Sequence, residues 1–141
     1  MVHGMGAGLA MFVLNLESLS NQRLVYAIDL PGFGRSSRVS FSSDPSDIES
    51  EYVESIENWR KNVGLKKMNL LGHSFGGHLT ALYSFKYPQN LNTAILADPW
   101  GMTSRNVNAD QRRTVPTWVR ALAKVLSNVN PLWGLRAAGQ E

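Results

Sequence analysis

The segment Gly72-His73-Ser74-Phe75-Gly76 places a serine between two glycines, directly after an apolar run and directly before a helical pattern. This spacing is typical of a sharp turn from strand to helix that presents a serine hydroxyl for attack on an acyl carbon. Residues without a Cβ at both glycine positions let the strand and the helix approach closely. We therefore predict that Ser74 is a nucleophile. The alternative is a serine with a purely structural role in a tight turn.

Backbone amides near the serine could stabilise the oxyanion that such an attack creates. A helix that begins at Phe75 directs its unpaired N–H groups toward this position, so Phe75 N–H is the first predicted donor. The second donor is expected from a glycine-rich loop after a preceding strand, and "HGMGAG" is such a loop. We predict Met5 N–H as this donor, with His3, Gly4 and Gly6 shaping the loop.

Three apolar runs must position these groups, namely residues 24–29, 67–73 and 91–98. Their nearly continuous hydrophobicity predicts parallel strands that are covered by helices on both faces. Helical patterns alternate with them, so crossover units are expected. The predicted helices span about residues 10–19, 45–63, 75–87 and 116–126.

A serine hydroxyl needs an imidazole base and a carboxylate that orients the imidazole. The sequence contains three histidines, His3, His73 and His78, and none of them is placed as a base by its position in the pattern. His73 should point away from the serine and His78 should pack on the helix. Asp98 follows the third predicted strand; we expect it to be structural, with orientation of a base as the alternative.

Composition excludes several classes of protein. The formal net charge is +3, with the basic excess after residue 101, and no basic-aromatic pattern indicates a nucleic-acid partner. The absence of cysteine removes disulfides and thiolate zinc sites, and we expect neither a metal nor a cofactor. The apolar runs are too short to span a bilayer and the amino terminus does not resemble an export signal, so a cytoplasmic protein is expected.

Five segments together resemble one family: "HGMGAG", "AIDLPGFGRSSR", "ESEYVESIENWRKNVGLKKMNLLGHSFGG", "YSFKYP" and "LADPWGM". They are similar to the α/β-hydrolase fold, and in particular to the subfamily of N-acylphosphatidylethanolamine lysophospholipase and the lipid-droplet co-activator of adipose triglyceride lipase. The resemblance implies an α/β fold with a parallel sheet of about three strands, flanking helices and the start of a helical cap. It implies a core over residues 1–101 and a cap from 102 to 141. We expect the chain to be truncated at both ends, with the base after strands that it does not reach.

The resemblance also implies a function. The lysophospholipase branch has serine at the turn, as here, whereas the vertebrate co-activator has asparagine; Ser74 therefore favours a serine hydrolase of lipid esters, such as N-acyl phosphatidylethanolamine or related glycerophospholipids. We expect the 141 residues alone to be poorly active. The alternative is a non-enzymatic scaffold on lipid droplets that activates a partner lipase. In both cases the resemblance implies that the protein can associate peripherally with membranes or lipid droplets.

Four further features of the sequence bear on this interpretation. At position 78 this chain has a histidine where the relatives carry an apolar aromatic residue. Arg35 and Arg38 could meet a phosphate, but packing within their loop is the preferred interpretation. The helix at 116–126 could contact a membrane through its apolar face, although packing against the sheet is preferred. The family's H-x-x-x-x-D acyltransferase-like motif is not formed by any histidine of this chain.

Overall fold

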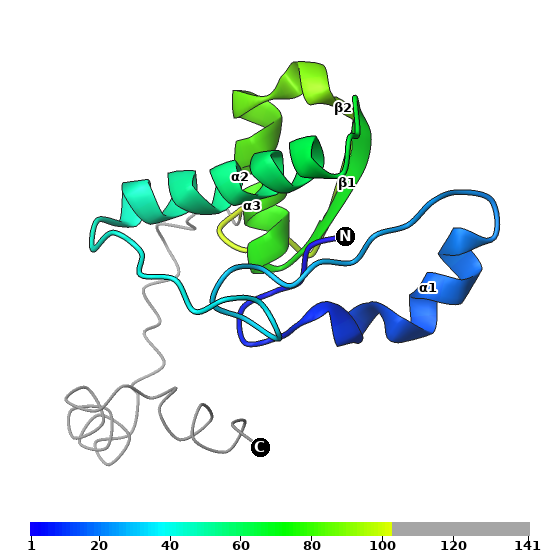
Figure 1. Ribbon diagram of the computed structural model, residues 1–141, viewed down its shortest axis with the longest axis horizontal. Coiled ribbons are helices and arrows are strands. Elements are labelled where there is room, and N and C mark those ends of the chain that lie inside the picture. Colours follow the sequence, from blue (N-terminus) through cyan, green and yellow to red (C-terminus); the bar gives the residue numbers. More distant parts are fainter. Residues whose placement is uncertain (103–141) are drawn as a thin grey trace, which may run out of the picture. The chain divides into compact units, whose positions relative to one another are not determined.

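The computed structural model describes residues 1–102, which form helices packed on a small parallel sheet (Figure 1). The elements follow one another as a 3₁₀ turn Leu9–Phe12, α1 Val13–Ser20, α2 Pro45–Asn62, β1 Met68–His73, α3 Phe75–Lys86, a second 3₁₀ turn Pro88–Asn90 and β2 Leu91–Ala97. The predicted helices at 10–19, 45–63 and 75–87 are thus present. The predicted helix at 116–126, and all of the expected cap apart from Met102, lie outside the described residues.

The sheet consists of β1 and β2 in parallel, joined by α3 as the crossover. The register pairs Leu70 with Ala94 and His73 with Ala97, so both strands end at the same edge. A parallel pair requires a long connection, and α3 supplies it. The crossover unit predicted from the sequence is therefore confirmed, as is a partial α/β fold.

The expected third strand at residues 24–29 forms only an isolated pairing. Val2 bridges Ile28 on one side and Gly72 on the other, so the amino-terminal segment lies between residues 24–29 and β1. Ile28 N–H donates to Met1 O at 3.2 Å, and the Met1 amino group donates to Tyr26 O at 2.6 Å. The number of strands was overestimated because residues 24–29 pair with this short segment and not with β1, which leaves no continuous ladder.

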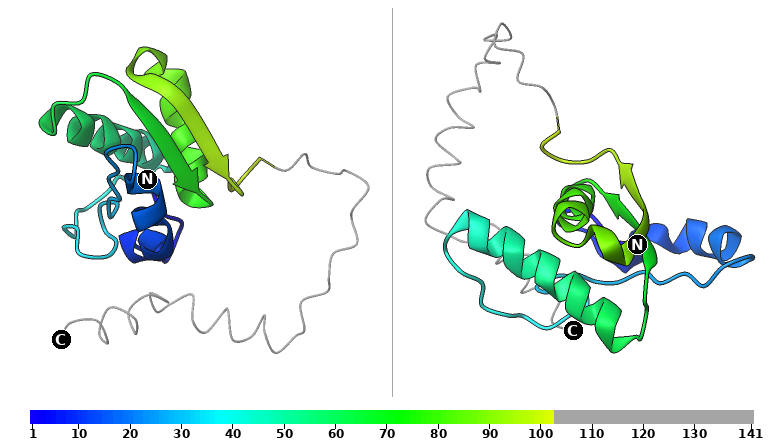
Figure 2. Two further views of the ribbon diagram at one scale, coloured as in Figure 1. Left: turned by 90° about the vertical axis from the view of Figure 1, so that its right-hand side faces the viewer. Right: turned by 90° about the horizontal axis from the view of Figure 1, so that it is seen from above.

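One face of the sheet is covered and the other is open within the described residues. α3 contacts both strands and α2 packs against α3, as two views in Figure 2 show. Leu70 and Leu79 are buried in the core between them, together with Ile56 of α2. On the opposite face of β1, Asn69 is exposed, and β2 is open on both faces, since Ile95 and Leu96 point to opposite sides of the sheet and both are exposed. The prediction that helices cover both faces was wrong for these residues, because α1 makes no substantial contact with either strand.

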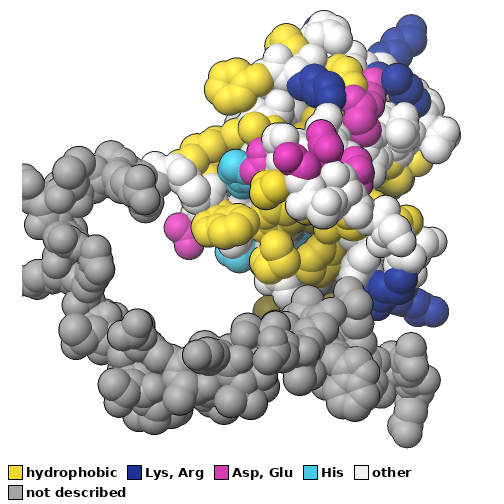
Figure 3. Space-filling model, turned by 90° about the vertical axis from the view of Figure 1, so that its left-hand side faces the viewer, with side chains coloured by type: hydrophobic (Ala, Val, Ile, Leu, Met, Phe, Trp, Pro, Cys, Tyr) yellow, Lys and Arg dark blue, Asp and Glu magenta, His cyan; other side chains and the backbone are white. Residues whose placement is uncertain are grey.

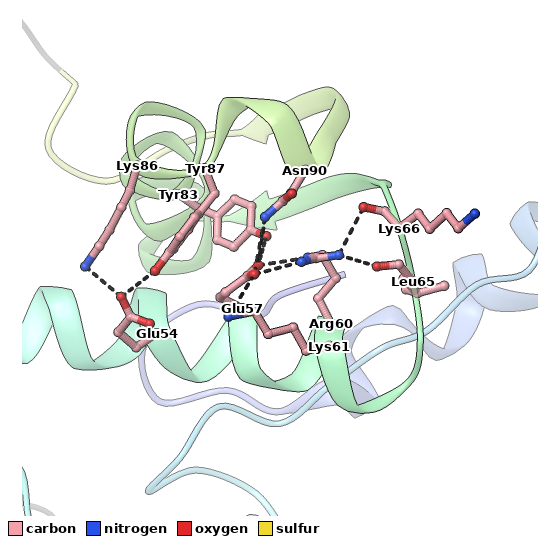
Figure 4. A network of polar contacts seen from close by, with 10 residues as sticks. All are labelled: Glu54, Glu57, Arg60, Lys61, Leu65, Lys66, Tyr83, Lys86, Tyr87 and Asn90. Carbon is pink, nitrogen blue, oxygen red and sulfur yellow. Dashed lines mark hydrogen bonds and ion pairs between the residues drawn. The ribbon is translucent and has the colours of Figure 1, made fainter.

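A buried ion pair joins α2 to the end of α3 and to the turn before β1 (Figure 4). Glu57 is 2% exposed and accepts hydrogen bonds from Arg60 Nε at 2.8 Å and from Tyr83 Oη at 2.6 Å. Arg60 also donates to the carbonyls of Leu65 and Lys66. Each charge is therefore paired and hydrogen-bonded, which a buried ion pair requires.

The hydrogen bond from Arg60 is the main reason that the pKa of Glu57 is lowered to about 2; burial opposes this shift, and the hydroxyl of Tyr83 assists it. Burial, with the neighbouring Glu57 carboxylate, raises the pKa of Tyr83. Both shifts keep Glu57 ionised and Tyr83 protonated, so Tyr83 remains the donor near neutral pH.

Replacing Tyr83 by Phe should lower the free energy of unfolding by about 2 kcal/mol, since it removes a buried hydrogen bond to a charged group. Tyr87→Phe is the matched control. It removes the bond from Tyr87 Oη to Glu54 at 2.5 Å, but Glu54 is 41% exposed and water can replace the hydroxyl, so a loss below about 1 kcal/mol is expected. Urea denaturation measures both. Equal losses would contradict the assigned role of the Glu57 cluster.

The same cluster predicts a dependence of stability on pH. The pKa of Glu57 is about 2 in the folded chain against an ordinary value of 4.5, so its contribution is complete above pH 4.5 and is lost as the pH falls toward 2. Glu57→Gln should be less stable than the wild type at pH 6, and this difference should shrink at pH 3. The exposed variant Glu17→Gln serves as control and should follow the wild type at both values. If the difference in stability between the wild type and Glu57→Gln is the same at pH 6 and pH 3, the ionised carboxylate of Glu57 is not its cause.

Candidate active site

Ser74 occupies the turn between β1 and α3 in a strained backbone conformation. Its φ is 52° and its ψ is −115°, a region that residues with a side chain seldom adopt. Its side chain makes no capping hydrogen bond to the helix that it precedes, and the residue is partly exposed. The sharp turn predicted from the sequence is present, and it leaves the hydroxyl accessible.

Hydrogen bonds to the end of β2 hold this strained turn. Ser74 N–H donates to Ala97 O at 3.0 Å, and Trp100 N–H donates to Ser74 O at 3.0 Å. Between these partners, Asp98 also has a positive φ, of 45°. Strain of this kind persists only where the surroundings determine the conformation. Asp98 therefore lies in a turn whose conformation the neighbouring bonds determine.

The two glycines of the turn leave no room for a side chain. A Cβ on Gly72 would overlap the carbonyl of Gly76 and Thr80 Oγ1. A Cβ on Gly76 would overlap the carbonyls of Val2 and His3. Gly72 thus allows β1 to contact α3, and Gly76 allows α3 to contact the amino-terminal segment. These glycines thus bring the loop at residues 3–8 against the start of α3.

The two predicted oxyanion donors belong to segments that border Ser74, the start of α3 and the loop after Gly4. Phe75 is the first residue of α3, and its N–H has no backbone acceptor within residues 1–102. Met5 is 56% exposed, and its N–H likewise has none there. Gly4 approaches the serine so closely that a Cβ built on it would lie 3.0 Å from Ser74 Cβ. Both amides are free to bind an oxyanion, and their role stays a prediction.

His3 is fully buried and both of its ring nitrogens are engaged. Leu30 N–H donates to Nε2 at 3.0 Å, so Nε2 carries no proton and Nδ1 donates to Gly4 O at 2.8 Å. The distance of 3.8 Å from Nε2 to Asp29 Oδ1 is accordingly not an ion pair. His3 fixes the loop and cannot take a proton from Ser74.

The other two histidines are also poor candidates for the base. His73 Nδ1 is buried without a hydrogen-bond partner within the described residues, beside Gly4. His78 Nε2 lies 2.9 Å from Glu49 Oε1 on α2, and its ring lies near those of Phe75 and Trp100. Figure 3 shows histidine side chains beside acidic and hydrophobic ones on one face of the molecule. Glu49 thus supplies the polar partner that accommodates an imidazole where the relatives were expected to have an apolar aromatic residue.

The loop at residues 29–38 is held by its own contacts. Arg38 donates to the carbonyls of Ser36 and Gly34 at 3.1 and 3.0 Å, which confirms that this arginine packs within the loop. Asp29 accepts hydrogen bonds from the backbone of Leu9 and Arg35. Asp29 was not predicted as a site residue. Its position at the end of an apolar run and directly before "LPGFG" is the feature of the sequence that indicates it.

A cavity of about 290 Å³ lies elsewhere, between residues 24–28 and β1. Its lining includes Met1, Tyr26, Trp59 and Leu71, and none of the predicted site residues contributes to it. We assign it no part in the chemistry. None of the helices within residues 1–102 has the length and apolar character needed to cross a bilayer.

Alanine at Gly72 or Gly76 should destabilise the protein by about 3 kcal/mol or more, because each Cβ would meet rigid backbone. Gly64→Ala is the matched control: its φ of 74° strains an alanine, but no atom lies within 4 Å, so a loss of about 1 kcal/mol is expected. Urea denaturation provides the comparison. Losses at Gly72 and Gly76 no larger than that at Gly64 would show that the turn can relax.

The comparisons with known proteins agree on one family. The family model for the alpha/beta hydrolase fold matches residues 1–135. The human protein named 1-acylglycerol-3-phosphate O-acyltransferase ABHD5 is 53% identical over 139 residues, and the bovine (lyso)-N-acylphosphatidylethanolamine lipase is 51% identical over 139 residues. Each match covers 99% of this chain but only 40% and 41% of those proteins, so the chain spans about two fifths of their length.

Two solved structures are similar in fold. A bacterial membrane phospholipase A superposes with a TM-score of 0.67 and 31% identity, covering 74% of this chain and 33% of that one. A monoacylglycerol lipase from Paleococcus ferrophilus superposes with a TM-score of 0.61 and is 27% identical in sequence. The match covers 92% of this chain and 46% of that one. The two curated relatives are of the subfamily that the sequence resembled. The chain belongs to the α/β-hydrolase fold family.

Proposed function

We propose that Ser74 is the nucleophile of a lipid ester hydrolase that acts on N-acyl phosphatidylethanolamine or related glycerophospholipids. The observation that carries this proposal is the backbone of Ser74, which is strained, locked to the end of β2 and followed by a helix that directs its free amides to one side. Strained residues cluster where geometry serves a reaction. The bovine and human relatives support the substrate class, because one is named as a lipase and the other as an acyltransferase of lipids.

In the proposed reaction, Ser74 Oγ forms a bond to the ester carbonyl carbon and passes its proton to a base. The carbonyl electron pair moves to oxygen, where Met5 N–H and Phe75 N–H stabilise the negative charge. Collapse of this intermediate breaks the bond to the alcohol oxygen, which leaves with a proton from the base. Water then releases the fatty acid by the same steps.

The base is not one of the three histidines of this sequence. His3 uses both ring nitrogens, His78 is paired with Glu49, and His73 has a buried Nδ1 and, as the residue before Ser74 in the strand, is expected to point away from it. Without a base, serine is a weak nucleophile. We therefore infer that these 141 residues alone hydrolyse esters slowly.

The rival function is a scaffold that binds a lipid surface and a partner lipase without catalysing hydrolysis. In such a scaffold Ser74 would never be deprotonated and would serve only the turn. Exposed apolar side chains close to the site, Met5 and Trp100, suit contact with lipid in either case. The hydroxyl of Ser74 favours the hydrolase, because the strained turn itself does not require one.

Imidazole added to the solvent should separate these functions. With the 141-residue chain and p-nitrophenyl butyrate, we expect little Ser74-dependent turnover in buffer alone. Imidazole should raise it by on the order of tenfold, because a free imidazole supplies part of what a positioned base provides. Ser74→Ala under the same conditions gives the background from imidazole itself, and a fluorophosphonate probe reports labelling of the serine directly.

Two outcomes would contradict parts of this account, the first the slow reaction of the 141 residues alone and the second the nucleophile itself. Fast Ser74-dependent turnover without imidazole would show that a base is present within the chain. No difference from Ser74→Ala at any imidazole concentration, with no labelling by the probe, would remove Ser74 as a nucleophile and favour the scaffold.

A further inference from the structure

The adjacent residues Asp29 and Leu30 hold both ends of the loop that carries Met5. At the amino-terminal end, Leu30 N–H donates to the buried ring of His3 at 3.0 Å. At the other end, Leu9 N–H donates to Asp29 Oδ1 at 2.6 Å. Leu9 starts the helical segment that continues into α1, so this carboxylate also satisfies an otherwise unpaired helix amide. The loop is therefore a short bridge fixed at two neighbouring points.

Asp29 is itself held in place. Its second oxygen accepts from Arg35 N–H at 3.0 Å, and its carbonyl accepts from Ser36 Oγ at 2.7 Å. Gly34 lies against the carboxylate so closely that a Cβ there would overlap it. The side chain of Asp29 is only 7% exposed. A carboxylate with both oxygens engaged and little access to water is a rigid support.

The supported loop borders the serine. Gly4 abuts Ser74 Cβ, Ala7 N–H donates to Gly4 O at 3.2 Å, and the turn between them contains Met5. Met5 has no hydrogen bond of its own backbone N–H within the described residues. Its position relative to Ser74 thus depends on where the two ends of the loop are held.

We propose that Asp29 is a positioning residue for acyl transfer: its carboxylate holds the Leu9 amide and thereby sets the place of Met5 N–H beside Ser74. This inference rests on the proposed function. The proposed role requires both carboxylate oxygens of Asp29 to be acceptors, because Oδ1 faces Leu9 N–H and Oδ2 faces Arg35 N–H. An asparagine offers one acceptor and one donor, so it must lose one of the two bonds.

The test compares Asp29→Asn with the wild type in the imidazole-assisted reaction of the 141-residue chain. We expect the Ser74-dependent maximal rate to fall about tenfold, since a displaced oxyanion donor loses part of its effect, while KM changes less than about twofold. Asp44→Asn is the matched control. It makes the same chemical change at the start of α2, where Asp44 Oδ1 accepts from Ser46 N–H at 2.8 Å, and should leave the rate unchanged.

A second variant removes the donor in place of the acceptor. Leu9→Pro deletes the N–H at the first position of a helical turn, where proline is tolerated, and the preceding Gly8 is extended, as a residue before proline should be. Leu9→Ala controls for the loss of the side chain. Leu9→Pro should reproduce the fall in rate seen for Asp29→Asn, whereas Leu9→Ala should not.

Amide hydrogen exchange provides a measurement that does not depend on activity. Within residues 4–9, the hydrogen-bonded amides of Ala7 and Leu9 should exchange at least about tenfold faster in Asp29→Asn than in the wild type, with α3 unchanged. If the wild type shows no Ser74-dependent reaction, the proposed function fails, and the exchange data still decide whether Asp29 holds the loop. An active wild type with an equal rate in Asp29→Asn and Leu9→Pro, or unchanged exchange at residues 4–9, would overturn the inference.

Discussion

The strained backbone of Ser74 is the constraint on which the arrangement of the site depends. A residue with a Cβ at φ 52° is held there by bonds to Ala97 and Trp100, at the end of the neighbouring strand. The parallel register places the ends of β1 and β2 at one edge, so the turn after β2 can reach the turn after β1. A strained turn would relax if either strand moved along the other. Sheet register and serine geometry are therefore one structural property of this chain.

The buried cluster at the far end of α3 supports the same geometry. Tyr83 lies near the end of α3, and its bond to Glu57 fixes the helix against α2, while Arg60 fixes α2 to the turn before β1. The helix is thus held at its start by Ser74 and near its end by Glu57. Because the direction of α3 decides where the Phe75 amide points, the cluster acts on the site without touching it. Burial makes this support strong and also makes it sensitive to protonation of Glu57.

Much of this arrangement could be predicted from the sequence. Apolar runs gave the positions of β1 and β2, and the acidic start of α2 with Pro45 and its end at Gly64 predicted that helix, because local propensity and packing agree there. The glycine spacing around Ser74 predicted the turn. Residues 24–29 were different: their composition suits a strand, but whether a strand forms depends on its neighbour, and the neighbour is the short segment at Val2. Asp29 and Glu57 were missed because the partners that make them important lie far away in the sequence.

The backbone of the site does not by itself distinguish a hydrolase from a scaffold. The glycines at 72 and 76, the backbone bonds to Ala97 O and from Trp100 N–H, and the support from Asp29 would hold the same turn around an asparagine as around a serine. What distinguishes the two functions is whether the side chain at position 74 can lose a proton. That depends on the hydroxyl, which this chain has, and on an imidazole within reach, a role that His3 and His78 do not suit because His3 uses both ring nitrogens and His78 is paired with Glu49. A fold that keeps the turn and the amides in place can thus change between catalysis and binding by changes in very few side chains.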